Sequence, residues 1–300
     1  MTNILTFIEC RFTELEGAYS PNTLKSYYAD ARAFVDWCET NSFIPFPLAS
    51  ATLRDYIDSR DQIYTYITMR RRISALRRVN SILGYVDVSR TEEVYLAMRR
   101  LKRNSFHMQR QAAGINAGLL TEMIQAQPET LNGIRNRALL SLGYDFLARR
   151  SELVALRVSD IQFEADGSLR GIIRRSKSDP FGRGRLVFGS KRSAELLKHW
   201  LKLKPKTIDP IFCAVMHGTC IDRALCDRSV SEIIKRSTLK VRDCKTPNVR
   251  DVSGHSLRVG AAQDLLSSGR DIAAIMRAGG WSNTAIVSRY LRLAEQNIWS

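Results

Sequence analysis

The sequence predicts a mainly helical protein of two domains, of which the second also contains a small β-sheet. A chain of 300 residues is long enough for about two domains. Through the first hundred residues, apolar residues recur at the spacing of amphipathic helices. Two short segments with the residue types of β-strands, joined by a turn, occur only in the second half of the chain.

The first domain is expected to span residues 1–106 and to consist of helices. Ser20-Pro21-Asn22-Thr23 is typical of a helix start, because serine caps the first turn and proline is tolerated there. The segment that follows, 24–38, carries apolar residues at helical spacing. Further helices are expected at 51–58, 67–83 and 91–103.

The expected helix at 67–83 presents a ridge of arginines. Arg70 and Arg77 are seven residues apart, as are Arg71 and Arg78, so the members of each pair share a helix face. A solvated charged face is one interpretation of this ridge. No acidic residue is interleaved with these arginines, which favours contact with the phosphates of a nucleic acid.

A linker and a second domain follow the helical domain. Residues 104–117 lose clear periodicity, and we place a basic interdomain linker at 107–117. The second domain, 118–300, is expected to be mostly helical with a small sheet. Its expected elements are helices near 118–127 and 132–146, strands at 169–175 and 185–188 joined by a turn at Asp179-Pro180-Phe181-Gly182, and helix again after Lys191.

The charge balance indicates the kind of partner. Lysine and arginine number 46 and aspartate and glutamate 30, which leaves a net charge of +16. This excess favours a polyanionic partner, with nucleic acid first and an anionic membrane surface second. A merely basic soluble protein is the remaining alternative. No apolar run is long enough to span a membrane, and the N-terminus lacks the basic leader of a signal peptide.

Six cysteines stand at positions 10, 38, 213, 220, 226 and 244, without a C-x-x-C pair. This usage favours reduced thiols and an intracellular protein. With the basic charge, we expect a cytoplasmic, DNA-associated protein. Cys213, His217, Cys220 and Cys226 lie close together in the sequence, but their spacing fits no common zinc template. We therefore expect buried thiols there.

Two pairs of ionisable residues, each three positions apart, occur in the second domain. Arg149 and Glu152 fall on one side of a helical turn, as the members of an ordinary surface ion pair also do. His255 and Arg258 follow far downstream. On its own, a histidine near an arginine is more often structural than catalytic.

A glycine pair and two aromatic residues lie near the end of the sequence. Gly279 and Gly280 are expected to end one helix, and Ser282 or Asn283 to cap the next. Tyr290, nine residues after Trp281, is then expected in a short terminal helix. Alone, this tyrosine would be interpreted as a packed aromatic residue.

Taken together, these segments resemble the tyrosine recombinase (phage integrase) family. The order Arg, Glu, Lys, His-x-x-Arg, Trp, Tyr is the family's order, and the stretches GHSLRVGAA and IMRAGGWSN are similar to its motifs. The resemblance is sharp over 147–161 and 254–290 and looser elsewhere. It implies a helical core-binding (SAM-like) domain followed by a mixed α/β, mostly helical catalytic domain with a small β-sheet.

The resemblance implies that five residues bind and orient a phosphate. Arg149 and Arg258 would hold its non-bridging oxygens, which match the geometry of a guanidinium fork. His255 would bind the phosphate and assist proton transfer. Trp281 would donate its indole N–H, and Glu152 would support Arg149.

The resemblance also implies a nucleophile and a general acid. Tyr290 would attack the phosphate, which requires a nearby base or cationic field because the pKa of tyrosine is about 10. Lys177, the only lysine of the hairpin, would protonate the leaving 5′ oxygen, with a DNA-backbone contact as the alternative. Phosphotyrosine exchange conserves the ester bond energy and the site has no acidic cluster, so no ATP, cofactor or metal is implied.

The implied function is site-specific DNA recombination through a 3′-phosphotyrosyl intermediate. By resemblance, a homotetramer would act on double-stranded DNA with inverted-repeat sites and exchange strands through a Holliday junction. The alternatives are a type IB topoisomerase, which shares this chemistry but acts as a monomer, and a DNA-binding regulator with a dead site. Synapsis of two sites excludes the first alternative, and a covalent DNA adduct excludes the second.

Overall fold

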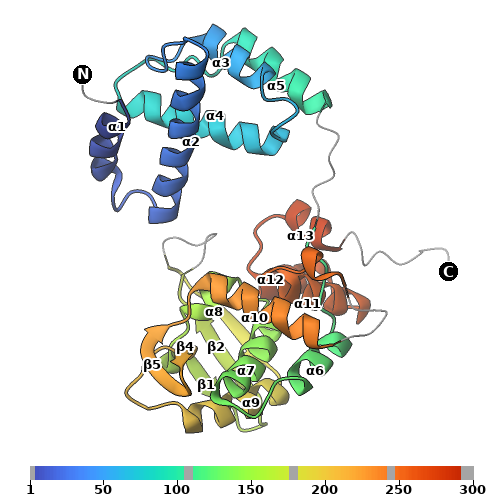
Figure 1. Cartoon of the computed structure of the whole chain (residues 1–300). Helices are drawn as coiled ribbons and strands as arrows, with labels where there is room; N and C mark the ends of the chain where they lie inside the picture. Colours follow the sequence, from blue (N-terminus) through green and yellow to red (C-terminus); the bar gives the residue numbers. More distant parts are fainter. Residues whose placement is uncertain (1–3, 105–110, 176–181, 242–246, 292–300) are drawn as a thin grey trace, which may run out of the picture. The chain divides into compact units, whose positions relative to one another are not determined.

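The structure is a computed structural model that describes residues 4–104, 111–175, 182–241 and 247–291 (Figure 1). The chain divides into two compact units, residues 1–109 and 110–300. Both are built mainly from helices, which confirms the predicted fold class. Among the described residues, no helix is both long and apolar enough to cross a membrane.

The first unit is a helical domain. Its helices are α1 (Ile4–Phe12), α2 (Pro21–Thr40), α3 (Ser50–Asp58), α4 (Tyr66–Ile82) and α5 (Glu92–Asn104). The four predicted helices are confirmed, and the Ser20 hydroxyl accepts from the backbone N–H of Thr23, as its sequence context suggests. The short α1 was not predicted. Aromatic packing among Phe34, Trp37 and Tyr56 fills the core between α2 and α3.

The second unit contains eight α-helices among its described residues. These are α6 (Ala117–Gln125), α7 (Leu131–Asp145), α8 (Arg150–Val154), α9 (Lys191–Leu203), α10 (Asp227–Lys240), α11 (Ser256–Ser267), α12 (Ile272–Gly279) and α13 (Thr284–Leu291). Helix α7 is buried over most of its surface and packs against α6, α9 and α11. Because most of its residues are buried, polar ones among them, α7 is the central helix of this domain.

A three-stranded antiparallel sheet packs beside α7 and α9. It consists of β1 (Ile161–Phe163), β2 (Leu169–Ile173) and β3 (Arg185–Gly189), in that order. The two predicted strands are confirmed as β2 and β3, whereas β1 was not predicted. Ile173 pairs with Arg185 at the open end of the hairpin. Residues 179–181 of the predicted turn, and Lys177, lie outside the described residues.

A second hairpin, β4 (Cys213–Met216) and β5 (Thr219–Ala224), corrects the expectation of helix alone after Lys191. His217 and Gly218 form its turn with φ of +48° and +75°, the left-handed values of a two-residue hairpin turn. Cys213 is buried, and burial raises the pKa of its thiol to about 11. Cys226 is exposed, so the expectation of buried thiols is wrong at that position.

Residues 111–116, which the sequence assigns to the linker, cross over helix α11. The backbone N–H of Ala113 donates to the carbonyl of Asp251, and that of Ile115 to the carbonyl of Ser256. A Cβ on Gly260 would lie 1.8 Å from the Ile115 carbonyl oxygen. Glycine at this position of α11 is therefore what allows the crossing segment to lie against the helix.

We predict that Gly260→Ala destabilises the protein, because the added methyl overlaps the Ile115 carbonyl in a segment that is held by the hydrogen bonds of Ala113 and Ile115. The loss should be about 3 kcal/mol of unfolding free energy. Gly118→Ala is the matched control, since the nearest atom to its added Cβ, the Asn116 Oδ1, is 3.6 Å away. Urea unfolding of the two full-length variants compares them, and equal stability would contradict this role of Gly260.

Candidate active site

Six of the seven residues predicted to be catalytic lie among the described residues, all in the second unit. They come from the start of α8, the start of α11, the turn between α12 and α13, and α13 itself (Figure 1). The seventh, Lys177, lies outside the described residues. The six are Arg149, Glu152, His255, Arg258, Trp281 and Tyr290.

The carboxylate of Glu152 is buried and is shared by two arginines. Arg149, the N-cap of α8, donates from Nη1 to Glu152 Oε1 at 2.5 Å and from its backbone N–H to Oε2 at 2.9 Å. Arg185 of β3 donates to the same Oε2 at 3.3 Å. Because Glu152 is only 3% exposed, this is not the ordinary surface ion pair that spacing alone also allows.

Arg258 is a buried cation with unused hydrogen-bond donors. Its side chain is fully buried within α11, donates from Nη1 to the Leu147 carbonyl, and lies with Cζ 4.0 Å from the Trp281 ring centroid. Nε and Nη2 are buried without a hydrogen-bond partner in the described part of the chain. A buried unpaired donor costs about 1–3 kcal/mol, and more when it is charged.

The burial of Arg258 also disfavours its charge. Burial lowers the pKa of this guanidinium, and the nearby charge of Arg149 lowers it further, while Glu152 opposes the shift. Arginine nevertheless stays protonated in proteins. The free protein therefore holds a cation whose surroundings leave it short of both negative charge and acceptors.

The carbonyl that meets Arg258 is positioned by an unusual turn. Leu147 follows α7 with φ of +45°, a left-handed conformation that is usually taken by glycine at a helix end. The backbone N–H groups of Leu147 and Ala148 donate back to Tyr144 and Gly143. The Leu147 side chain is buried in a cluster with Trp281 and Val287, which holds the turn in place.

The predicted end of α12 is confirmed, and it positions Trp281. Gly280 caps the helix with φ of +64°. A Cβ on Gly279 would lie 2.0 Å from Trp281 Cζ3, so glycine is required for the indole to fold back over the helix end. The Asn283 side chain accepts from the backbone N–H of Ala285 at the start of α13, which confirms the predicted cap.

Tyr290 lies in α13, as predicted, beside two other residues of the site. Its ring centroid is 5.3 Å from that of Trp281 and 6.4 Å from that of His255, to which the ring is nearly parallel. The Tyr290 carbonyl accepts from the side-chain amides of Gln111 at 3.0 Å and Gln263 at 3.2 Å. The helix that carries the tyrosine is thus tied to α11 and to the crossing segment.

His255 stands immediately before α11, and its backbone N–H donates to the Ser253 hydroxyl at 3.1 Å. Burial lowers the pKa of its imidazole, and the positive charges of Arg258, Arg150 and Arg149 lower it further, partly opposed by Glu152. A neutral imidazole at pH 7 can accept a proton. Next to Tyr290, such an acceptor suits the activation of a phenol.

Taken together, these contacts assemble a site that can bind an anionic phosphate beside a phenol. Arg149 and Arg258 offer guanidinium donors in a largely buried setting, where charge-assisted hydrogen bonds are strong. Tyr290 is the nearby group with a nucleophilic oxygen, and His255 the nearby base. Phosphoryl transfer needs this combination of charge stabilisation and an activated nucleophile.

Three supporting residues escaped the sequence reasoning: Arg185, Gln111 and Gln263. Arg185 had a usable signal, because strand alternation puts it on the same face as the buried Val187 and Gly189. No sequence signal pointed to Gln111 or Gln263, because each donates to the Tyr290 carbonyl, which is distant in the sequence.

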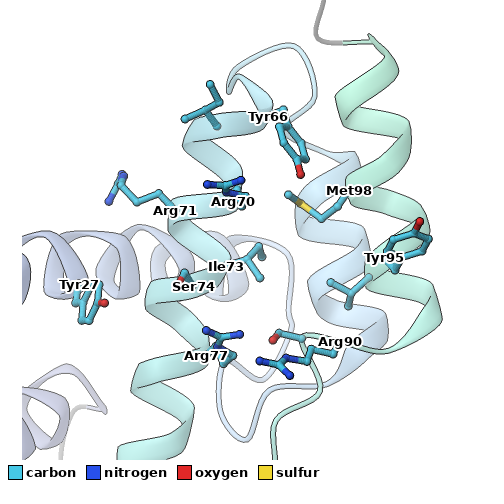
Figure 2. A pocket seen from close by; sticks show the side chains of 13 residues that line it. Tyr27, Tyr66, Arg70, Arg71, Ile73, Ser74, Arg77, Arg90, Tyr95 and Met98 are labelled. Carbon is cyan, nitrogen blue, oxygen red and sulfur yellow. The ribbon is translucent and has the colours of Figure 1, made fainter. Parts of the chain in front are cut away.

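In the first unit, part of the predicted arginine ridge lines a groove of about 680 Å³ (Figure 2). Arg70, Arg71 and Arg77 line it from α4, together with tyrosines of neighbouring helices. Arg78 does not line the groove and lies over the Tyr19 ring, with Cζ 5.3 Å from the centroid. Arg71 is partly neutralised by the buried Asp30 of α2.

Comparison with known proteins gives consistent results. Residues 115–297 match the phage integrase family. The chain is 28% identical to the recombinase Cre of Escherichia phage P1 over 291 residues, covering 92% of this chain and 85% of Cre. It is also 28% identical to an integrase/recombinase XerD homologue of Selenomonas ruminantium, covering 92% and 83%.

Solved structures share the fold. A fragment of the Tn1549 transposon integrase in complex with transposon right end DNA matches with a TM-score of 0.69 at 11% identity, covering 99% of this chain and 96% of the fragment. The XerH site-specific recombinase bound to palindromic difH substrate matches with a TM-score of 0.65 at 17% identity, covering 98% and 92%.

We predict that His255 titrates below the ordinary histidine value near 6.5 in the free protein, because burial and three arginines disfavour its cationic form. An anionic phosphate bound beside it should then raise its pKa. Imidazole NMR titration with and without duplex DNA measures both values, with His255→Gln to assign the signal. A His255 pKa at or above 6.5 in the free protein would contradict this account of the site.

Proposed function

The chain belongs to the phage integrase family, and we propose that it is a site-specific recombinase that cuts and rejoins DNA through a 3′-phosphotyrosyl bond at Tyr290. The observation that carries this proposal is the buried guanidinium of Arg258, which lies near Arg149 and Tyr290 and has two donors without a partner among the described residues. An anion with several oxygens, such as a phosphodiester, supplies the acceptors that this guanidinium lacks.

In the proposed reaction, the Tyr290 hydroxyl oxygen attacks the phosphorus of the scissile phosphodiester. A bond forms between the tyrosine oxygen and the 3′ phosphate, the bond to the 5′ oxygen breaks, and a free 5′ hydroxyl leaves. His255 takes the phenol proton, while Arg149 and Arg258 hold the non-bridging oxygens as negative charge gathers on them. Attack by a 5′ hydroxyl on the phosphotyrosine reverses these steps and reseals a strand.

Supporting roles are proposed for the remaining residues. Glu152 orients Arg149, and Trp281 donates its indole N–H to the phosphate. Lys177 protonates the leaving 5′ oxygen, since an alkoxide is a poor leaving group and lysine can release a proton whereas arginine cannot.

DNA binding is proposed to involve the first unit as well. Arg70, Arg71 and Arg77 would contact phosphates from the groove of Figure 2, and Arg78 from the neighbouring surface. The net charge of +16 supports a partner of this kind. The share of Arg71 in this binding is reduced by its ion pair with Asp30.

The assembly is proposed from the relatives. XerH is bound to a palindromic substrate, which supports inverted-repeat target sites for this chain. Four protomers would then bring two sites together and exchange strands through a Holliday junction, in the cytoplasm, where the DNA lies. If the protein instead acts as a monomer and only relaxes supercoiled DNA, it is a topoisomerase.

We predict that Tyr290→Phe retains DNA binding and loses every covalent protein–DNA adduct, because it removes only a hydroxyl. Denaturing electrophoresis of the protein with 3′-labelled and 5′-labelled target DNA measures the adduct and its polarity. Tyr85→Phe, at an exposed tyrosine outside the groove of Figure 2, does not alter the reacting oxygen and should still form the adduct. An adduct that persists in Tyr290→Phe would refute the assignment of the nucleophile.

We predict that Lys177→Ala slows cleavage of a normal site by about 10²–10⁴-fold. A site with sulfur at the 5′-bridging position of the scissile phosphate should restore most of this rate, because a thiolate leaves without a proton. Arg149→Ala should gain no such rescue, since its defect lies at the non-bridging oxygens. If the sulfur substrate fails to rescue Lys177→Ala, the lysine is a backbone contact and the general acid lies elsewhere.

A further inference from the structure

Arg185 is a largely buried arginine that the proposed reaction does not use. It stands at the first position of β3, and its side chain is 14% exposed. Burial lowers the pKa of its guanidinium, Glu152 opposes this shift, and the charge of Arg149 adds to it. Its guanidinium lies close enough to those of Arg149 and Arg258 to repel them, and its ion pair with Glu152 offsets this repulsion.

The Arg185 guanidinium joins three separate pieces of the active site. It donates to Glu152 Oε2 at 3.3 Å and to the Phe146 carbonyl at 3.2 Å, and it also donates to the Ala278 carbonyl. Glu152 in turn holds Arg149, and Phe146 directly precedes Leu147, whose carbonyl accepts from Arg258. Ala278 lies in the last turn of α12, three residues before Trp281.

The aliphatic part of the Arg185 side chain packs closely against the end of α12. A Cβ on Gly280 would lie 2.8 Å from Arg185 Cδ, so the left-handed glycine that ends α12 leaves space for this arginine. The planar fork of arginine can donate in several fixed directions, whereas the ammonium of lysine is a single point. Three acceptors from three elements therefore require arginine at this position.

We propose that Arg185 is a positioning residue for DNA cleavage, which fixes the Arg149–Glu152 pair relative to the turn that carries Trp281. The proposal rests on the proposed function, because it assigns Arg149 to the scissile phosphate. Without Arg185, Glu152 would keep Arg149 as its sole described guanidinium partner, and the two would be free to shift away from α12. Misplacement of a phosphate-binding group by about 1 Å costs about a hundredfold in rate.

The test is Arg185→Met, which keeps most of the stem and removes the donors. We expect covalent adduct formation at a normal site to slow by about a hundredfold, with unchanged affinity for DNA. The matched control is Arg170→Met on β2, because Arg170 points outward on the same sheet and pairs with Glu164 at 2.8 Å. This control should cleave at the rate of the unchanged protein.

A second substrate separates positioning from a general loss of structure. A methyl group in place of one non-bridging oxygen removes the charge of the scissile phosphate and so relieves the need for Arg149. On this neutral site, Arg149→Ala and Arg185→Met should both lose much of their defect, the latter shrinking to about tenfold or less. Damage to the fold alone would slow both substrates by the same factor.

The outcomes distinguish the inference from the proposed function. If Arg149→Ala is relieved by the neutral phosphate and Arg185→Met is not, the positioning role is wrong while the proposed function stands. If the unchanged protein forms no adduct, or Arg149→Ala is not relieved, the proposed function itself fails. If the methionine variant does not fold, Arg185→Lys, which keeps the charge, provides the same comparison. Its cleavage should slow less than that of Arg185→Met, and the neutral phosphate should again reduce the defect.

Discussion

The excess of positive charge buried around Glu152 is the constraint on which the rest of this site depends. One carboxylate faces the guanidinium groups of Arg149 and Arg185, and Arg258 lies close enough for its pKa to respond to both Arg149 and Glu152. Like charges in a largely buried setting repel one another strongly. A bound phosphate would relieve this repulsion.

Backbone carbonyls at two helix ends make the arrangement tolerable. Phe146 and Leu147 follow α7, and Ala278 lies at the end of α12, and all three carbonyls accept from the buried arginines. The C-terminal end of a helix carries partial negative charge, which favours a cation placed there. The left-handed residues Leu147 and Gly280 stand at these helix ends, beside the carbonyls that accept from the guanidinium groups.

The residues proposed for the chemistry of the site were easier to find in the sequence than the contacts that hold them together. Arg149, Glu152, His255, Arg258, Trp281 and Tyr290 stand at short, regular spacings within local motifs, and the structure brings them into one unit. The supports are harder to find, because each is a contact between distant segments. Gln111 reaches the carbonyl of Tyr290, and Arg185 reaches that of Ala278, and neither partner is visible in the local pattern.

In the fold, too, elements with a local sequence pattern were predicted more closely than elements that depend on distant contacts. Helices α2 to α7 carry periodic apolar faces or caps, and β2 and β3 alternate clearly, so their positions were predicted closely. The short β1 has only three residues, too few for a periodicity, and its strand character depends on pairing with β2. In β4–β5, Gly218 was a usable signal of a turn that went unrecognised. In the structure, His217 and Gly218 take the left-handed backbone of a tight hairpin turn.

Arg258 serves to bind an anion, and its burial lowers the stability of the folded protein. The unfolding free energy of Arg258→Met tests this most directly. Measured by urea unfolding of the full-length protein without DNA, this variant should be more stable than the unchanged protein by about 1–2 kcal/mol, because it removes a buried cation with two unpaired donors. Arg135→Met is the control, since Arg135 is equally buried but donates to the Cys213 carbonyl and to Asn136. An Arg258→Met variant destabilised as much as this control would contradict the claim.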